Sequence, residues 1–207
     1  MSRARVGYWN HNVHYQPVIL AAVPPGCGPA LDVGCGDGML ACRLADRCDE
    51  VTGIDRDPRM IALARAQAHG RTRFIEADFP TYPFEAGSFD FVCANTSLHH
   101  MDFAAALTAM ARALRPGGRL AVIGLAADRS LADLLAAAPA VPVNLVYRAL
   151  YRQGESGAPV MDPQMSWREV RAAAAQTLPG VRYRRRLLWR YSLLWRKPGP
   201  RPRAAAA

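Results

Sequence analysis

Short apolar runs alternate with helical patterns between residues 29 and 125, and this alternation restricts the chain to few folds. Each apolar run has the length of a buried strand, and apolar residues recur at helical spacing after most of them. Strands that alternate with helices form parallel sheets through right-handed crossovers. The sequence therefore predicts an α/β protein. The expected strands are 29–34, 50–55, 72–78, 88–96 and 119–125, and the expected helices are 38–47, 57–70 and 102–118.

The stretch DVGCGDG joins the first expected strand to the first expected helix. Gly34, Gly36 and Gly38 alternate with other residues after Asp32. Glycines between a strand and a helix bring backbone N–H groups close to a ligand with no side chain in the way. A dinucleotide fingerprint would have its third glycine at position 39, where Met39 stands, and an acid at position 32 would repel a pyrophosphate. The turn instead suits a ligand with an ammonium group and hydroxyls.

With this motif the sequence resembles the class I S-adenosylmethionine-dependent methyltransferases, in particular those that act on small molecules. Their first motif is an acid followed by alternating glycines, and the resemblance extends over nearly all of residues 17–125 and returns in the final two strands. It implies a Rossmann-like seven-stranded sheet of order 3-2-1-4-5-7-6, with the last strand antiparallel and helices on both faces. It also implies S-adenosyl-L-methionine as the cofactor, bound at Asp32, Gly34, Cys35 and Gly36.

Asp55 ends the second expected strand, 21 residues after Gly34. A carboxylate at that point reaches ribose hydroxyls in nucleotide-binding α/β folds. The alternative is a helix-capping acid, but Asp57 can already fill that role. The resemblance places Arg56 beside the adenine and Met60 near the same edge, although Met60 is equally well a core residue.

Two further cofactor contacts are expected at the ends of the third and fourth strands. The resemblance assigns Asp78 to the adenine amino group and Phe79 to a backbone contact, whereas the alternative for Asp78 is a solvated loop acid. Asn95 lies at the carboxyl end of the fourth expected strand, where ligands bind in open α/β sheets. We therefore expect Asn95 in the cofactor pocket.

His100 and His99 follow the fourth expected strand and are the candidate catalytic residues. An imidazole titrates near neutrality and can act as a general base if the methyl acceptor must lose a proton. His100 is slightly favoured. The alternative is a packing or helix-start role, because Asp102 follows at once.

The resemblance implies that the N-terminal segment 1–28 forms a lid or helix over the cofactor or acceptor. Its stretch YWNHNVHYQP is rich in aromatic and imidazole side chains, and the alternative is a surface segment docked on the core. His11 and His14 have no evident third ligand, so no metal site is predicted. The candidate lid residues are Tyr8, Trp9, His11, His14 and Tyr15.

Residues 126–163 interrupt the alternation, and the resemblance to small-molecule methyltransferases implies that they form a substrate cap. We expect one or two apolar helices here, broken at Pro139 and Pro142. The apolar content favours a partly apolar acceptor, but the same residues suit a homodimer face or a membrane surface. After the cap, Ser166 and Glu169 form a capping-box pattern that opens a helix, and two final strands are expected over 181–190 and 191–198.

The charge distribution and the cysteine content limit the binding partners and the cellular location that we expect. Residues 1–163 contain 15 Arg and 16 acidic residues, whereas residues 164–207 contain 10 Arg, Lys197 and only Glu169. The basic C-terminal region is compatible with a nucleic-acid or anionic-membrane partner, whereas the alternative is biased codon usage with arginine at solvated positions. No interleaved aromatics mark a nucleic-acid surface, so nucleic acid is not the expected partner. The five cysteines form no CxxC pair and indicate reduced thiols in the cytoplasm. No apolar run is long enough for a membrane span.

The sequence thus predicts one methyltransferase domain over residues 1–207, ending in a disordered tail at 198–207. Its expected reaction is methylation of a small, partly apolar acceptor, with oxygen somewhat favoured as the acceptor atom. Methylation of RNA or protein through the basic C-terminal region and a non-catalytic cofactor-binding protein are the alternatives. A nicotinamide dehydrogenase is disfavoured, because the glycine motif differs and no Tyr-x-x-x-Lys pair exists.

Overall fold

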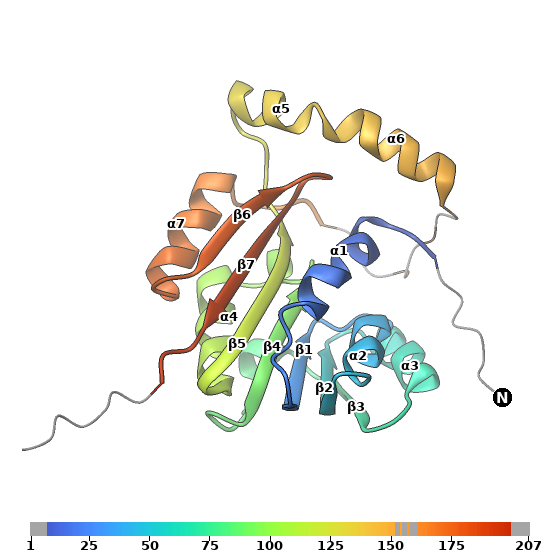
Figure 1. Ribbon diagram of the computed structural model, residues 1–207, viewed down its shortest axis with the longest axis vertical. Helices are drawn as coiled ribbons and strands as arrows, with labels where there is room; N and C mark the ends of the chain where they lie inside the picture. Colours follow the sequence, from blue (N-terminus) through green and yellow to red (C-terminus); the bar gives the residue numbers. More distant parts are fainter. Residues whose placement is uncertain (1–7, 152–153, 155–156, 158–160, 200–207) are drawn as a thin grey trace, which may run out of the picture.

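The computed structural model describes residues 8–151, 154, 157 and 161–199. Seven strands form a single sheet with the order β3-β2-β1-β4-β5-β7-β6 (Figure 1). Strand β7 runs antiparallel to both β5 and β6, and the remaining pairs are parallel. The predicted Rossmann-like topology is confirmed. The strands are β1 (Cys27–Val33), β2 (Cys48–Asp55), β3 (Thr72–Glu76), β4 (Phe89–Asn95), β5 (Leu114–Leu125), β6 (Arg182–Arg186) and β7 (Arg190–Arg196).

Helices cover both faces of the sheet, and each face has its own apolar core. On one face α1, α2 and α3 pack against the sheet, and on the other face α4 and α7 do so. The central strands are buried on both sides, which is why they read as continuous apolar runs. The helices are α1 (His11–Leu20), α2 (Met39–Leu44), α3 (Pro58–Gln67), α4 (Phe103–Ala113), α5 (Leu131–Ala137), α6 (Ala140–Leu150) and α7 (Trp167–Thr177), with short 3₁₀ turns η1 (Phe79–Thr81) and η2 (Leu98–His100).

Local capping chemistry fixes several helix starts as predicted. Asp57 accepts a hydrogen bond from the Arg59 N–H at the start of α3, with Pro58 at its first position. Ser166 and Glu169 form the complete capping box of α7. Each cap satisfies N–H groups that the first turn of a helix leaves without a partner.

Most element boundaries differ from the sequence prediction by a few residues, and three differences have a clear local cause. Helix α4 ends at Ala113, and β5 already begins at Leu114, because the Pro-Gly-Gly segment lies within an irregular stretch of the strand rather than after the helix. The interruption of the cap lies between α5 and α6, and Pro142 is inside the first turn of α6, where a missing N–H is tolerated. The last two strands are shorter than expected, because residues 187–189 form the turn between them.

All five cysteines are free thiols and buried, at Cys27, Cys35, Cys42, Cys48 and Cys93. No helix in the described part of the chain is long and apolar enough to cross a membrane. The expected disordered tail falls mostly on residues 200–207, which lie outside the described residues.

Candidate cofactor and acceptor site

The glycine turn after β1 is tied to the end of β2. The N–H groups of Gly34 and Cys35 both donate to the carbonyl oxygen of Ile54, at 2.8 and 3.1 Å. Gly34 has φ +69°, and a Cβ atom there would lie 2.3 Å from the Cβ atom of Ser97. Gly36 has φ +54°, but a Cβ atom there would meet nothing within 4 Å. Gly34 is therefore required by packing, whereas Gly36 faces open space.

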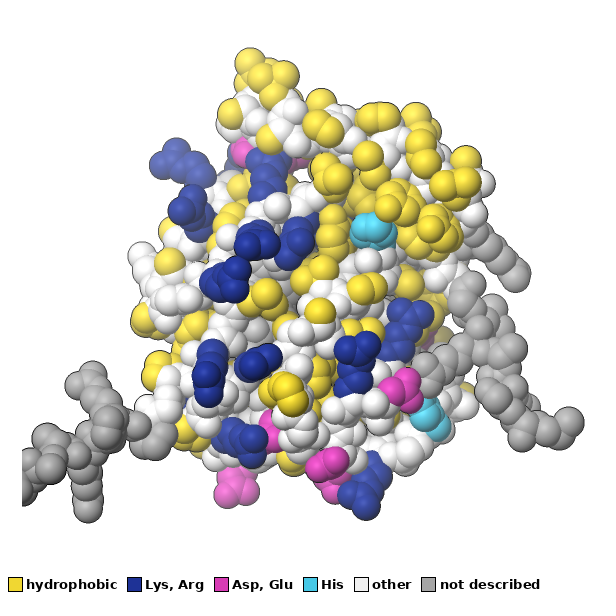
Figure 2. Space-filling view, viewed as in Figure 1, with side chains coloured by type: hydrophobic (Ala, Val, Ile, Leu, Met, Phe, Trp, Pro, Cys, Tyr) yellow, Lys and Arg dark blue, Asp and Glu magenta, His cyan; other side chains and the backbone are white. Residues whose placement is uncertain are grey.

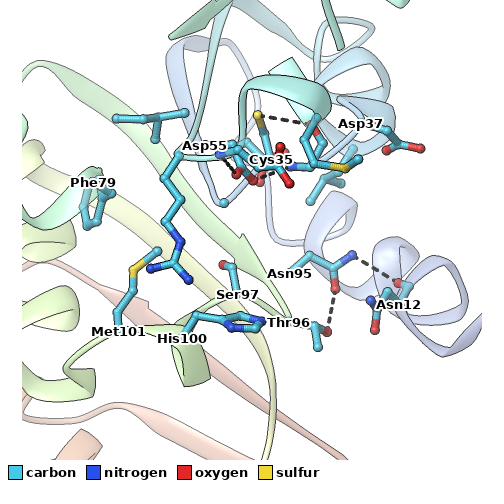
Figure 3. Close-up of a pocket in the computed structure, with 18 of the residues that line it drawn as sticks. Asn12, Cys35, Asp37, Asp55, Phe79, Asn95, Thr96, Ser97, His100 and Met101 are labelled. Atoms are coloured by element: carbon cyan, nitrogen blue, oxygen red, sulfur yellow. Dashed lines mark hydrogen bonds between the residues drawn. The ribbon is translucent and has the colours of Figure 1, made fainter. Parts of the chain in front are cut away.

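That open space is a cavity at the carboxyl ends of β1, β2 and β4. It is the position at which open α/β sheets bind ligands. The glycine turn and the β2 end form one wall, and residues after β4 form the opposite wall (Figure 3). Every predicted cofactor residue lines it, namely Asp32, Gly34, Cys35, Gly36, Asp55, Arg56, Met60, Asp78, Phe79 and Asn95.

Asp32 contributes a buried carboxyl group to this cavity. The thiol of Cys93 donates to its Oδ1 at 3.6 Å, while its Oδ2 has no hydrogen-bond partner among the described residues. Burial, with smaller contributions from the neighbouring Asp55 and Asp37 carboxylates, raises the pKa of Asp32 to about 7. An unpaired buried oxygen needs a donor, and a ligand ammonium group would supply one.

Asp55 is held in place by two backbone groups. Its Oδ2 accepts from the Gly36 N–H at 2.9 Å, and its Oδ1 accepts from the Asp57 N–H at 3.0 Å. Because Asp57 caps α3, Asp55 is not needed as the cap and lines the cavity instead. The remaining lone pairs of Asp55 can accept from ligand hydroxyls.

Two of the predicted cofactor residues, Asp78 and Phe79, lie at the start of η1. Asp78 precedes this turn and its side chain makes no capping hydrogen bond. Phe79 and Met60 are only 4% and 3% exposed, so both belong to the core and line the cavity at once. The two interpretations of Met60 are therefore compatible.

Asn95 connects the end of β4 to helix α1. Its Nδ2 donates to the carbonyl oxygen of Asn12 at 3.2 Å, and the Thr96 hydroxyl lies 3.5 Å from its Oδ1 (Figure 3). Thr96 has φ +62°, which is a strained conformation for a β-branched residue. Ser97 follows and donates to the Val33 carbonyl oxygen at 2.6 Å. The chain is thus held tightly where it turns along the cavity.

The two candidate catalytic histidines have different positions. His100 lines the cavity, and burial together with Arg56 lowers its pKa, so its imidazole is neutral and can accept a proton. His99 is not among the lining residues, and its Nδ1 is buried without a partner among the described residues. Burial, with further contributions from His100 and Arg190, lowers the pKa of His99 to about 4. Of the two candidate catalytic histidines, therefore, only His100 lines the cavity.

The N-terminal segment closes one side of the cavity. The Tyr8 hydroxyl donates to Asp37 at 3.0 Å, which joins the segment to the glycine turn. Trp9, His11 and His14 instead face α6, where Trp9 stacks on Tyr147 with 5.2 Å between ring centroids. No group of three metal-binding side chains occurs within the described ranges.

Several lining residues were not predicted from the sequence. Polar residues at the start of α1 and within it line the cavity, but they alternate with aromatic residues and show no clear pattern in the sequence. Residues of the turns after β1 and β4 lie far apart in the sequence, and only the fold brings them together. These residues are Asn10, Asn12, Val13, Gln16, Asp37, Leu40, Ile54, Asp57, Ala77, Thr96, Ser97 and Met101.

Known proteins share both the sequence pattern and the fold. Residues 31–122 match the family described as Methyltransferase domain. The chain is 34% identical over 192 residues to an uncharacterized methyltransferase of Mycobacterium tuberculosis, Rv0089, covering 92% of this chain and 98% of that protein. It is 43% identical over 105 residues to the O-methyltransferase rstn1 of Aspergillus nomiae, covering 47% of each. A SAM-dependent methyltransferase structure from Methanosarcina mazei superimposes with a TM-score of 0.64 at 18% identity, covering 89% and 98% of the two chains.

The fold and the family match define an S-adenosylmethionine-dependent methyltransferase. The chain belongs to the class I methyltransferases and uses S-adenosylmethionine as its cofactor. The cavity fits this cofactor, because it combines an unpaired buried carboxyl oxygen at Asp32 with unfilled space in front of Gly36.

Proposed function

We propose that this enzyme methylates a small, partly apolar molecule, with oxygen slightly favoured as the acceptor atom. The observation that supports this most is the mixed character of the side chains that line the cavity. Apolar side chains of Val13, Leu40 and Met101 line the same space as one neutral imidazole. The printed name of the relative from Aspergillus nomiae, an O-methyltransferase, agrees with this acceptor class.

The roles of the site residues form part of the proposal. S-adenosylmethionine supplies a methyl group on a positively charged sulfur, already activated for transfer to a nucleophile. Asp32 pairs with its ammonium group, and Asp55 accepts from its ribose hydroxyls. Gly34, Cys35 and Gly36 offer close backbone contact, and Arg56, Met60, Asp78, Phe79 and Asn95 surround the remainder.

His100 is the proposed general base. An acceptor hydroxyl must lose its proton as its oxygen gains the methyl group, and a neutral imidazole in the cavity can take that proton. The protein's larger contribution is alignment, because the methyl group is already reactive. His99 has no such access and serves as a matched control.

We also propose a domain organisation for the enzyme. The segment 1–28 acts as a lid through α1, and residues 126–163 act as a cap over the acceptor side, within one domain. The five free buried thiols favour a cytoplasmic location.

Methylation of RNA or protein is the second candidate, and exposed arginines of β6 favour it. Arg182 and Arg184 are solvent-exposed on that strand. An enzyme of this kind would bind a polyanionic or acidic substrate there and lose affinity with rising salt. A non-catalytic cofactor-binding protein is the remaining alternative.

Calorimetry tests the cofactor site first. S-adenosylmethionine and S-adenosylhomocysteine are titrated into the wild type, an Asp55→Ala variant and an Asp55→Asn variant, with NADH as the control ligand. We expect micromolar binding in the wild type, weaker binding in the Asn variant and loss of binding in the Ala variant. Equal binding by all three would refute the role of Asp55.

Transfer of a labelled methyl group tests the acceptor. Phenols and carboxylic acids with apolar substituents are screened beside amine acceptors, bulk RNA and denatured protein. His100→Gln should lower turnover, and His99→Gln should not. Label only in RNA or protein would overturn the small-molecule proposal, and cofactor binding with no transfer to any acceptor would favour the binding protein.

A further inference from the structure

Helices α5 and α6 expose a continuous set of large apolar side chains. Seven of the eleven large hydrophobic side chains exposed in the described part of the chain lie on these two helices. Single exposed leucines are ordinary, but a gathered set indicates a binding surface. We call this set the cap face, and it consists of Leu131, Leu134, Leu135, Val141, Leu145, Val146 and Leu150, between 52% and 73% exposed.

The cap face is the outer side of a docked helix, not a core face left uncovered. The inner side of α6 already packs on the protein, where Tyr147 stacks on Trp9 and Asn144 lies 2.8 Å from His11. Ala140 is 2% exposed on that inner side. Figure 1 shows α5 and α6 standing out from the sheet with their outer side free. The exposed apolar residues of α6, in contrast to Val143 and Tyr147, therefore lie away from the side that packs on the protein.

Helix α5 is attached to the sheet by charge rather than by apolar packing. No residue of α5 is buried. Arg185 of β6 donates to the Asp133 carboxylate at 3.0 Å and to the Asp133 carbonyl oxygen at 2.9 Å. This contact joins the cap face directly to strand β6, and it neutralises the acid on α5.

Arginines next to the cap face give its surroundings a positive charge. Strand alternation places Arg182, Arg184 and Arg186 on the opposite side of β6 from Tyr183, which packs in the core beside α7. Figure 2 shows dark-blue side chains gathered below the hydrophobic side chains of the cap. Arg148 is the one charged residue of α6. Within the described ranges no carboxylate forms an ion pair with these four arginines.

We propose that the cap face and the β6 arginines together bind the surface of an anionic lipid bilayer. Such a surface has negative headgroups above an apolar layer, so leucines can enter the layer while arginines remain at the phosphates. The protruding, convex helices suit a flat surface better than a groove. A second copy of the chain would bring a second set of the same arginines into the interface, because a two-fold contact uses the same patch on both copies. Charge therefore favours the lipid surface over self-association.

The position of the surface links it to the cavity. Tyr147 on the inner side of α6 packs on Trp9, and Asn10 and Asn12 of the adjoining segment line the cavity. One consequence, which rests on the proposed function, is that an apolar acceptor dissolved in the bilayer would arrive beside the lid. The lipid-binding proposal itself does not depend on methyl transfer.

Vesicle co-sedimentation of the full chain tests the proposal without any assay of activity. Vesicles of phosphatidylcholine with one-third phosphatidylglycerol are compared with vesicles of phosphatidylcholine alone, at low and high salt. We expect binding to the anionic vesicles that decreases with salt, and little binding to the neutral ones. A wild type that stays in the supernatant with anionic vesicles at low salt would overturn the proposal.

Variants separate the two parts of the surface. The triple variant Leu131→Gln, Leu145→Gln, Leu150→Gln should weaken partitioning about tenfold or more, since it removes the apolar groups that enter the bilayer. Leu63→Gln is its control, because Leu63 is 46% exposed on α3. Unchanged binding by the triple variant would refute the role of the cap face.

A second pair of variants tests the arginines. Arg182→Gln with Arg184→Gln should weaken binding about 25-fold, since one arginine near an anionic surface is worth about fivefold. Arg71→Gln is the control, because Arg71 is exposed next to β3 at the opposite edge of the sheet. Thermal unfolding of every variant verifies folding. Analytical ultracentrifugation measures the oligomeric state of the wild type and of the triple leucine variant. If the wild type is a dimer, the variant is a monomer and neither binds vesicles, the cap face contacts a second copy of the chain and the lipid proposal is wrong.

Discussion

The buried carboxyl group of Asp32 should make the stability of the ligand-free protein depend on pH. Burial raises the pKa of Asp32 from 3.8 to about 7 in the folded protein. A group with a raised folded-state pKa stabilises the fold below its unfolded pKa, and this contribution is lost as the pH rises to the folded pKa. Between pH 4 and pH 7 the ligand-free protein should therefore become less stable because of this one group.

The size of the effect follows from the two pKa values. The full difference corresponds to about 4 kcal/mol, and about 2–3 kcal/mol of it should develop between pH 5 and pH 8. Asp32→Asn keeps the shape but removes the titration. The amide leaves an unpaired donor at a cost of about 1–3 kcal/mol, but this cost does not change with pH. The diagnostic quantity is therefore the slope of stability against pH, not the stability at one pH.

Urea unfolding of the ligand-free wild type and Asp32→Asn, followed by circular dichroism from pH 5 to pH 8, measures this slope. We expect the difference in unfolding free energy between the two proteins to change by about 2–3 kcal/mol in favour of the variant as the pH rises. S-adenosylmethionine should then stabilise the wild type and have little effect on the variant. Parallel pH profiles for the two proteins would refute the reasoning, because all other titrating groups are shared.

Further predictions concern the glycine turn, the base and the cap. Gly34→Ala should lower the unfolding free energy by about 2–4 kcal/mol, because its Cβ atom would lie 2.3 Å from that of Ser97. Gly36→Ala should lower the unfolding free energy by only about 1–2 kcal/mol, but it should weaken cofactor binding, measured by calorimetry, about tenfold or more. Equal destabilisation by the Gly34 and Gly36 variants would contradict the geometry of the turn. The methyl-transfer rate should rise with pH and reach half of its maximum below pH 6.5, the ordinary histidine pKa, because burial lowers the pKa of His100. His100→Gln should lower the rate about 10²–10⁴-fold and remove this rise, and a half-maximal point above pH 6.5 would argue against His100. Tyr147→Ala should speed hydrogen exchange in α6 but not in the central strands, whereas uniform faster exchange would indicate global destabilisation.

The sheet could be predicted from the sequence because its signals are local and agree with one another. Alternating strands and helices, the glycine turn and the capping acid Asp57 all predict the same βαβ units, and the strand order followed from the family resemblance. The predicted cofactor residues line one cavity because carboxyl ends of neighbouring parallel strands meet there.

The remaining features depend on tertiary contacts that no local pattern encodes. Asn12 and Gln16 reach the cavity only because α1 packs across β4 and β5. His99 and His100 are adjacent in the 3₁₀ turn η2, but only the His100 side chain lines the cavity. The start of β5 at Leu114 is set by pairing with Phe89, which overrides the helical pattern before it.

The reactivity of the five buried cysteines can report local opening of the protein. A thiol-specific reagent can modify Cys27, Cys48 and Cys93 only when the core between the sheet and helices α1, α2 and α3 opens, and Cys42 only when α2 detaches. Cys35 lies in the glycine turn at 7% exposure, and burial raises the pKa of its thiol, so it too stays unreactive in the closed state. The order in which the five thiols become modified would therefore map the opening of the molecule from its cofactor loop to its centre, with no label introduced by mutation.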